Sequence, residues 1–230
     1  MEKMAVESKI SPEALPASRR LFVWAQIIVA FLFIELALWA PTRPLRNQWA
    51  GAAAIAILIF VAMDALIDPP SLTRLGLRLP TLSGAVMMLG IGLAAAVFLM
   101  AVVHLAGGPI PANPTWFPGF QTVWGYALWA LIQEFILQSF FFTRFEELFG
   151  GAAAVWIAAT LFATAHLPSP VLTVGTLIGA LFFCEMFRRY RSIYLLGVVH
   201  AMLGLTIAMT MPDSVLHHMR VGMGYLRYHH

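Results

Sequence analysis

Long apolar stretches separated by short polar connections run through most of the chain. An α-helix rises about 1.5 Å per residue, so about 20 apolar residues are needed to cross the roughly 30 Å of hydrocarbon in a bilayer. Stretches of this kind lie at roughly 21–40, 49–68, 82–106, 121–143, 152–167, 170–187 and 192–211. This pattern predicts an all-α, polytopic transmembrane helix bundle with about seven spans.

The composition supports a membrane protein. Hydrophobic residues make up 60% of the 230 residues, charged residues only 11%, and the mean hydropathy is +0.82. Soluble domains carry about 25% charged residues because their surface faces water. The net charge is +3, but no basic face with interleaved aromatic residues is visible, so we expect membrane lipid and not nucleic acid as a partner. The one cysteine, Cys184, rules out a disulfide framework.

The basic residues predict the orientation of the bundle, because Lys and Arg are retained on the cytoplasmic side. Seven spans with a cytoplasmic N-terminus put most of them inside. The inner set is Lys3, Lys9, Arg19, Arg20, Arg74, Arg78, Arg144, Arg188, Arg189 and Arg191; the outer set is Arg43, Arg46, Arg220 and Arg227. We therefore expect an integral protein of the plasma membrane with its N-terminus in the cytoplasm.

One shift in composition divides the chain. A Pro- and Arg-containing connection follows the second apolar stretch, before a more closely spaced group of five. We expect a polar N-terminal tail at 1–20, two leading transmembrane helices at 21–68, a helical core at 69–211 and a polar C-terminal tail at 212–230.

Ionisable residues inside apolar stretches are costly, so each is a candidate functional residue. They are Glu35, Asp64, Glu134, Glu185, His104, His166 and His200. Glu185 lies one turn before two arginines, so an ion pair explains it, and a structural role is also expected for Asp64, near the end of its span. For Glu35 and His104, a structural polar contact is the expected role.

Glu134 differs from these because polar side chains surround it. Gln138 lies four residues later on the same face of the helix, and Gln133 is its neighbour. Two later helices add His166 and His200. One Glu and two His can activate a water and stabilise an oxyanion, ligate zinc, or relay protons. From spacing alone, a hydrolase, a transporter-like proton relay and simple helix–helix contacts all remain open.

The order and spacing of these residues resemble the CPBP family, which comprises CAAX proteases and bacteriocin-processing membrane proteins and includes the type II CAAX prenyl endopeptidases. That family shows Glu-Glu-x-x-x-Arg, Phe-x-x-x-His and His-x-x-x-Asn or Asp on successive helices. The matching positions here are Gln133, Glu134 and Gln138, then Phe162 and His166, then His200 and Gly204. The resemblance covers roughly residues 120–205, and a Leu-Gly-Leu-Arg segment at 75–78 extends it loosely.

The resemblance implies an intramembrane endopeptidase that hydrolyses a peptide bond of a membrane-associated peptide or protein. It implies that Glu134 and His166 activate the water and that His200 helps to hold the oxyanion. Gln133, Gln138, Phe162 and Gly204 would support them. Three of these positions depart from the family. Glutamine replaces the first Glu and the Arg, and Gly204 has no side chain to donate a hydrogen bond.

The two glutamine replacements fit together electrostatically. Glu, Glu and Arg sum to minus one, as do Gln133, Glu134 and Gln138. That pattern suits a retuned site; the alternative is a catalytically inactive relative acting as a membrane scaffold, immunity factor or helix-binding protein. We expect no cofactor. A divalent metal such as zinc is the alternative, but Gln133 and Gln138 are the only visible candidates to orient the histidine rings for it.

Overall fold

A computed structural model of the chain describes residues 15–67, 69, 72–108 and 120–228. Most of the expected N-terminal tail lies outside these residues. All of the described elements are helical, which confirms the all-α prediction. In chain order they are α1 (Ala17–Leu38), α2 (Arg43–Ile67), α3 (Leu82–Leu105), α4 (Phe120–Glu134), η2 (Phe135–Phe142), α5 (Thr143–Phe149), α6 (Gly151–Thr164), α7 (Pro170–Tyr190), α8 (Tyr194–Thr210), α9 (Asp213–Leu216), η3 (His217–Met219) and α10 (Met223–Leu226).

Each predicted apolar stretch contains a helix, and four of these helices are long and apolar enough to cross a bilayer. These four are α1, α2, α3 and α7, whereas α6 and α8 are shorter apolar helices. The outer surface is also apolar: Leu82, Phe98 and Leu105 of α3 are each at least 71% exposed. Large apolar side chains exposed along a helix are stable against lipid and not against water. The protein is therefore an integral membrane protein.

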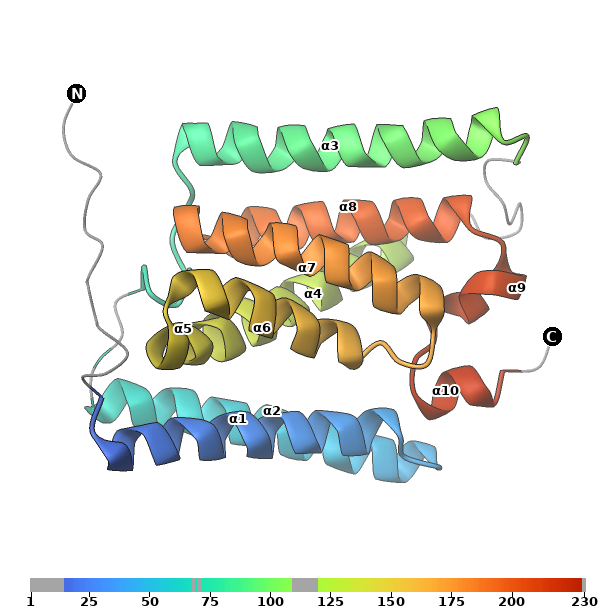
Figure 1. Ribbon diagram of the computed structural model, residues 1–230. Helices are drawn as coiled ribbons and strands as arrows, with labels where there is room; N and C mark the ends of the chain where they lie inside the picture. Colours follow the sequence, from blue (N-terminus) through green and yellow to red (C-terminus); the bar gives the residue numbers. More distant parts are fainter. Residues whose placement is uncertain (1–14, 68, 70–71, 109–119, 229–230) are drawn as a thin grey trace.

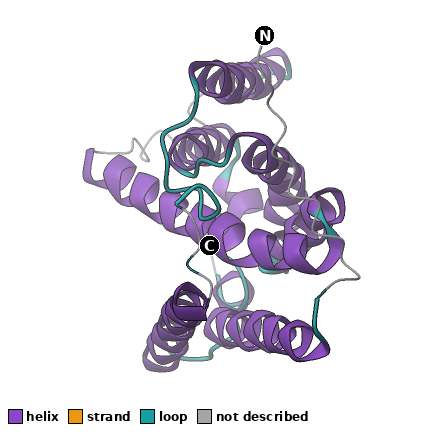
Figure 2. Cartoon of the chain, turned by 90° about the vertical axis from the view of Figure 1, so that its left-hand side faces the viewer, coloured by secondary structure: helices purple, strands orange, loops and turns teal. Residues whose placement is uncertain are grey.

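The long helices lie side by side with similar directions (Figure 1). α8 packs against both α3 and α4, α6 packs against α7, and α1 pairs with α2. The pair α1–α2 forms one side of the bundle and α3 the other, and Figure 2 shows the same separation from the end. The helices α4 and α8, which carry Glu134 and His200, lie between these two sides.

Small residues allow the closest helix contacts. A Cβ added at Gly92 of α3 would lie 2.5 Å from Val199 of α8, and one at Gly197 of α8 would lie 3.0 Å from Leu131 of α4. Membrane helices associate mainly through close packing, because lipid offers no hydrophobic driving force between them. These glycines therefore hold α8 close to both of its neighbours.

The helix that begins as α4 widens into a π-helix, η2, for eight residues directly after Glu134. Two side chains at the start of the following helix, α5, donate hydrogen bonds back to carbonyls of this π-helix. Thr143 donates from its hydroxyl to the carbonyl of Ser139 (2.8 Å), and Arg144 donates from Nη1 to the carbonyl of Phe140 (3.0 Å). Ser139 donates in turn to the carbonyl of Leu75 (2.6 Å). Since π-helices are rare and often found at functional sites, this segment is a notable place for a buried carboxylate.

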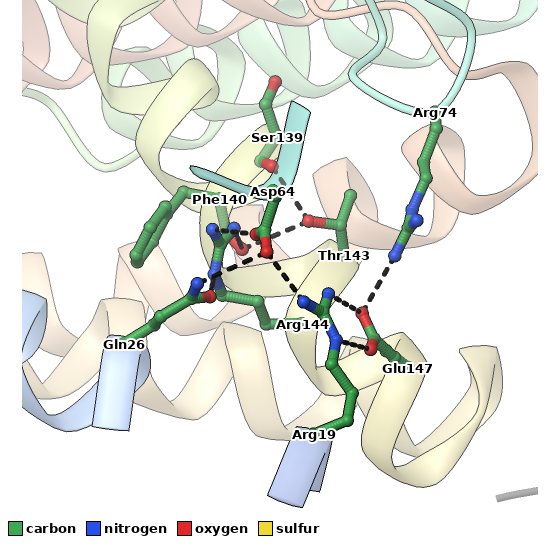
Figure 3. Close-up of polar contacts among 9 residues, drawn as sticks. All are labelled: Arg19, Gln26, Asp64, Arg74, Ser139, Phe140, Thr143, Arg144 and Glu147. Atoms are coloured by element: carbon green, nitrogen blue, oxygen red, sulfur yellow. Dashed lines mark hydrogen bonds and ion pairs between the residues drawn. The ribbon is translucent and has the colours of Figure 1, made fainter. Parts of the chain in front are cut away.

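Arg144 joins this π-helix to the two leading helices (Figure 3). Its side chain is 5% exposed, donates from Nε to Gln26 of α1 (2.6 Å), and pairs through Nη2 with Asp64 of α2 (2.8 Å). Its guanidinium also lies 3.7 Å from the centre of the Phe140 ring. Every hydrogen-bonding edge of this buried cation is therefore held by a partner from another turn or helix.

The same cluster continues at the helix ends. Arg19 of α1 pairs with Asp64 (2.8 Å) and with Glu147 of α5 (2.7 Å), and Arg74 also pairs with Glu147 (2.9 Å) (Figure 3). We call these residues, with Arg144 and Gln26, the arginine cluster. These ion pairs give Asp64 the structural role that was expected of it. Glu185 likewise bonds to its two neighbouring arginines, at 2.8 and 2.5 Å.

The segment expected to be a polar C-terminal tail is folded over residues 212–228. It contains α9, η3 and α10, and Leu216 is buried against Leu172 and Ala208. A short tail of this kind is anchored because it carries an apolar residue that α7 and α8 can cover.

This C-terminal segment also contacts the leading pair, at the end of the bundle opposite the arginine cluster (Figure 1). Gly222 donates its N–H to the carbonyl of Leu167 (2.7 Å) and lies directly against the carbonyl of Leu38. Arg227 hydrogen-bonds to the carbonyl of Pro41. Gly222 has a φ of 55°, and a Cβ there would lie 2.3 Å from the Leu38 oxygen, so both backbone angle and space favour glycine.

We predict that Arg144→Met destabilises the protein by about 3 kcal/mol or more, because it removes one member of a buried ion-pair network. Arg189→Met is the matched control. Arg189 makes an ion pair with Glu185, but its side chain is 57% exposed, so the loss should stay under about 1 kcal/mol. Thermal unfolding of both purified variants in detergent measures the difference. Equal melting temperatures would contradict a structural role for the cluster.

Candidate active site

Glu134 is held by two hydrogen bonds in the interior of the bundle. It is the last residue of α4 and is 0% exposed. Its Oε1 lies 2.8 Å from Nδ1 of His200 on α8, and Nε2 of Gln138, on η2, donates to its Oε2 (3.1 Å). Each oxygen keeps a further lone pair, so the carboxyl group can also accept a hydrogen bond from water or substrate.

His200 is fixed by the carboxylate on one side and by aromatic rings on others. The Phe183 ring stacks on it at 5.2 Å and 16°, and the Phe162 ring meets it edge-on at 6.0 Å and 85°. A carboxylate at Nδ1 only accepts, so Nδ1 carries the proton and Nε2 of a neutral ring is left as an acceptor. The imidazole is therefore oriented by Glu134 as a proton acceptor.

His166 lies in the turn that follows α6 and does not share this contact. Its Nδ1 lies 2.8 Å from the backbone carbonyl of Phe162, which lies four residues earlier in α6. The centres of the two rings are 4.7 Å apart. The carbonyl fixes the proton on Nδ1 and leaves Nε2 free to accept. Phe162 thus touches both imidazoles, and Glu134 is bonded directly to His200 and not to His166 within the described contacts.

The expectation that only Gln133 and Gln138 could orient the histidine rings is wrong. The carbonyl of Phe162 and the carboxylate of Glu134 do so instead. Backbone acceptors cannot be read from side-chain patterns, which is why the sequence did not reveal the first of them. Within the described ranges, no group of three or more His, Cys, Asp or Glu side chains is close enough to hold a metal ion.

The remaining predicted residues lie in different surroundings. Gln133 is half-buried, and no side-chain hydrogen bond is described for it in the part of the chain that the structure covers. Gly204 contacts Tyr126 of α4, whose hydroxyl would lie 2.0 Å from a Cβ at that position. Cys184 is fully buried on α7. Tyr126 and Cys184 were not singled out from the sequence, although Tyr126 lies eight residues before Glu134 and hence on its face of the helix.

A comparison with known families finds a match over part of the chain. Residues 114–206 match the model of a family described as type II CAAX prenyl endopeptidase Rce1-like. The matched segment, which holds Glu134, His166 and His200, is similar to the CAAX proteases and supports the resemblance to the CPBP family. Neither a curated protein nor a solved structure matches the chain.

We predict that His166 and His200 both carry their neutral-state proton on Nδ1, because a carbonyl and a carboxylate accept from that atom. ¹⁵N NMR of histidine-labelled protein distinguishes the two tautomers, and His→Gln variants assign the signals. His104, which is exposed at the end of α3, is the control and should show the mixed tautomers of a solvated ring. A proton on Nε2 of His200 would contradict the Glu134 contact.

Proposed function

We propose that this protein hydrolyses a peptide bond of a membrane-associated peptide or protein, with Glu134 and His200 as the proton-accepting pair. The observation that carries the proposal is a fully buried carboxyl group bonded to an imidazole in the interior of a membrane bundle. Burial of such a group is costly, so a buried carboxyl group in a membrane bundle usually marks a functional site. A carboxylate–imidazole pair is well suited to general base catalysis.

The chemistry starts from a water placed against this pair. As its oxygen attacks the scissile carbonyl carbon, one proton passes to the Glu134–His200 pair and the carbonyl oxygen gains negative charge. When the C–N bond breaks, the pair returns that proton to the leaving amine. His166, with Nε2 free to accept, is a second group able to orient the water. The pairing differs from the one implied by the resemblance, in which Glu134 works with His166.

Gln138 takes the place of a cationic neighbour. Its amide donates to Glu134 without adding charge, so the carboxyl group keeps a hydrogen-bond donor while the site keeps its single negative charge. Gln133, which makes no described contact with Glu134, leaves only one carboxylate in the site. Both glutamines are thus compatible with a working base.

We predict that Glu134→Gln lowers turnover by about 10²- to 10⁴-fold, the usual cost of losing a general base. The assay uses internally quenched peptides in nanodiscs, one with a prenylated C-terminal CAAX sequence and one with an acyl-chain anchor. Glu185→Gln is the matched control, since Glu185 lies near the end of α7, paired with arginines away from the site. Equal loss in both variants would point to damage to the fold and not to the chemistry.

A catalytically inactive role as a scaffold or helix-binding protein is the second candidate, supported by the three departures at Gln133, Gln138 and Gly204. It is tested by complementation of a deletion phenotype with Glu134→Gln at normal protein level. Full complementation favours the inactive role, because a buried Gln can keep most of the hydrogen bonds. Loss of function at normal abundance assigns a chemical role to Glu134.

We further predict that Gln133→Glu alone lowers both stability and turnover, because it places a second carboxylate near Glu134 without a cation. Gln138→Arg alone also upsets the charge balance, at a side chain that is fully buried. The double variant restores a net charge of minus one and should melt at a higher temperature than either single variant. Additive losses in the double variant would show that the two positions are not electrostatically coupled.

A further inference from the structure

Tyr126 of α4 occupies the space that a side chain at position 204 of α8 would fill. A Cβ built on Gly204 would lie 2.0 Å from the Tyr126 hydroxyl oxygen, 2.7 Å from Cζ and 2.8 Å from Cε1. No real contact is that short, so Gly204 is required for the tyrosine to sit there. The hydroxyl group consequently lies against the backbone of α8.

This hydroxyl group lies on the same side of α4 as the Glu134 carboxyl group. Tyr126, Ala130 and Glu134 are spaced by four residues, which stacks them on one face, and Ala130 between them is fully buried and small. On α8, His200 and Gly204 are likewise one turn apart. Tyr126 thus approaches the same side of α8 that carries His200, the imidazole member of the proton-accepting pair.

The part of the chain that the structure describes leaves this hydroxyl group without a hydrogen bond. Tyr126 itself is half-buried. A donor left open beside a polar site is therefore available to a ligand.

The geometry of peptide hydrolysis says where such a donor belongs. Reacting atoms approach to about 3–3.5 Å, and an oxyanion donor lies about 2.7–3.1 Å from the oxygen that becomes charged. The donor therefore belongs several ångströms beyond the base, on the far side of the attacked carbon. One helical turn is about 5.4 Å, which is the separation of Gly204 from His200 along α8.

We propose that the Tyr126 hydroxyl donates a hydrogen bond to the carbonyl oxygen of the scissile peptide, in the place that Gly204 leaves without a side-chain donor. The proposal rests on the proposed endopeptidase function. The tyrosine keeps its proton: the water proton goes to the Glu134–His200 pair, and Tyr126 stabilises the negative charge that forms on the oxygen. Gly204 is then the residue that admits the donor from the neighbouring helix.

The first test is Tyr126→Phe, which removes the hydroxyl and keeps the ring. We expect kcat to fall about 10²- to 10³-fold with KM nearly unchanged, because an oxyanion donor acts mainly in the transition state. Tyr194→Phe is the matched control, since Tyr194 is 39% exposed at the start of α8. The probes are the two quenched peptides described above. Full activity of Tyr126→Phe would overturn the proposal.

A second variant moves the donor to α8. Tyr126→Leu makes room at position 204, and adding Gly204→Asn supplies an amide there. The double variant should recover at least tenfold in kcat over Tyr126→Leu alone, which a purely structural role of the ring would not produce. No recovery in a double variant that melts like the wild type would count against an oxyanion donor at this position.

Binding separates this proposal from the endopeptidase function itself. A peptide aldehyde of the probe sequence forms a hydrate that resembles the tetrahedral intermediate, so Tyr126→Phe should weaken it about tenfold or more while leaving the affinity for an uncleavable amide unchanged. If Glu134→Gln is inactive and Tyr126→Phe is fully active, only the tyrosine proposal fails. If the wild-type protein neither cleaves the peptides nor binds the aldehyde, the endopeptidase function fails and the tyrosine proposal with it.

Discussion

A carboxyl group inside a membrane bundle needs hydrogen-bond partners, because the hydrocarbon offers none. Glu134 obtains them from two directions: His200 arrives on α8, and Gln138 arrives one turn further along its own helix. Much of the helix packing can be understood from this requirement. α8 must lie close enough to α4 for a 2.8 Å contact, and Gly197, on which Leu131 rests, permits that approach. Removing the partners from Glu134 would leave a buried group that only protonation or water could stabilise.

The π-helix after Glu134 extends this dependence to the edge of the bundle. Its widened turns are bonded by Thr143 and Arg144, and Arg144 is held by Gln26 and Asp64 of the leading helices. The leading pair is therefore connected to the candidate active site through one buried cation. A substitution in α1 or α2 can alter Glu134 without any contact with it, because the register of η2 is fixed partly from outside the core.

Sequence patterns predicted the helices well and the long-range contacts poorly. Apolar length alone placed a helix in each of the seven stretches, and i,i+3 or i,i+4 spacing was enough to predict that Glu185 pairs with its arginines, since those contacts are local. The partners of Asp64 come from α1 and α5, and no spacing rule connects residues that far apart. The bond from His166 to a carbonyl and the position of Tyr126 against Gly204 depend on backbone atoms, which carry no residue-specific signal. The π-helix was equally invisible, because its apolar residues fit an α-helix as well.

Gly222 has a consequence for how the leading helices can move. At one end of the bundle α1 and α2 are bound by the arginine cluster, and at the other Gly222 and Arg227 contact the turn between them. Helices that are held at both ends can bend near their middle but cannot rotate as a rigid body about one end. Any opening beside α2 would therefore form near the middle of these helices, within the bilayer.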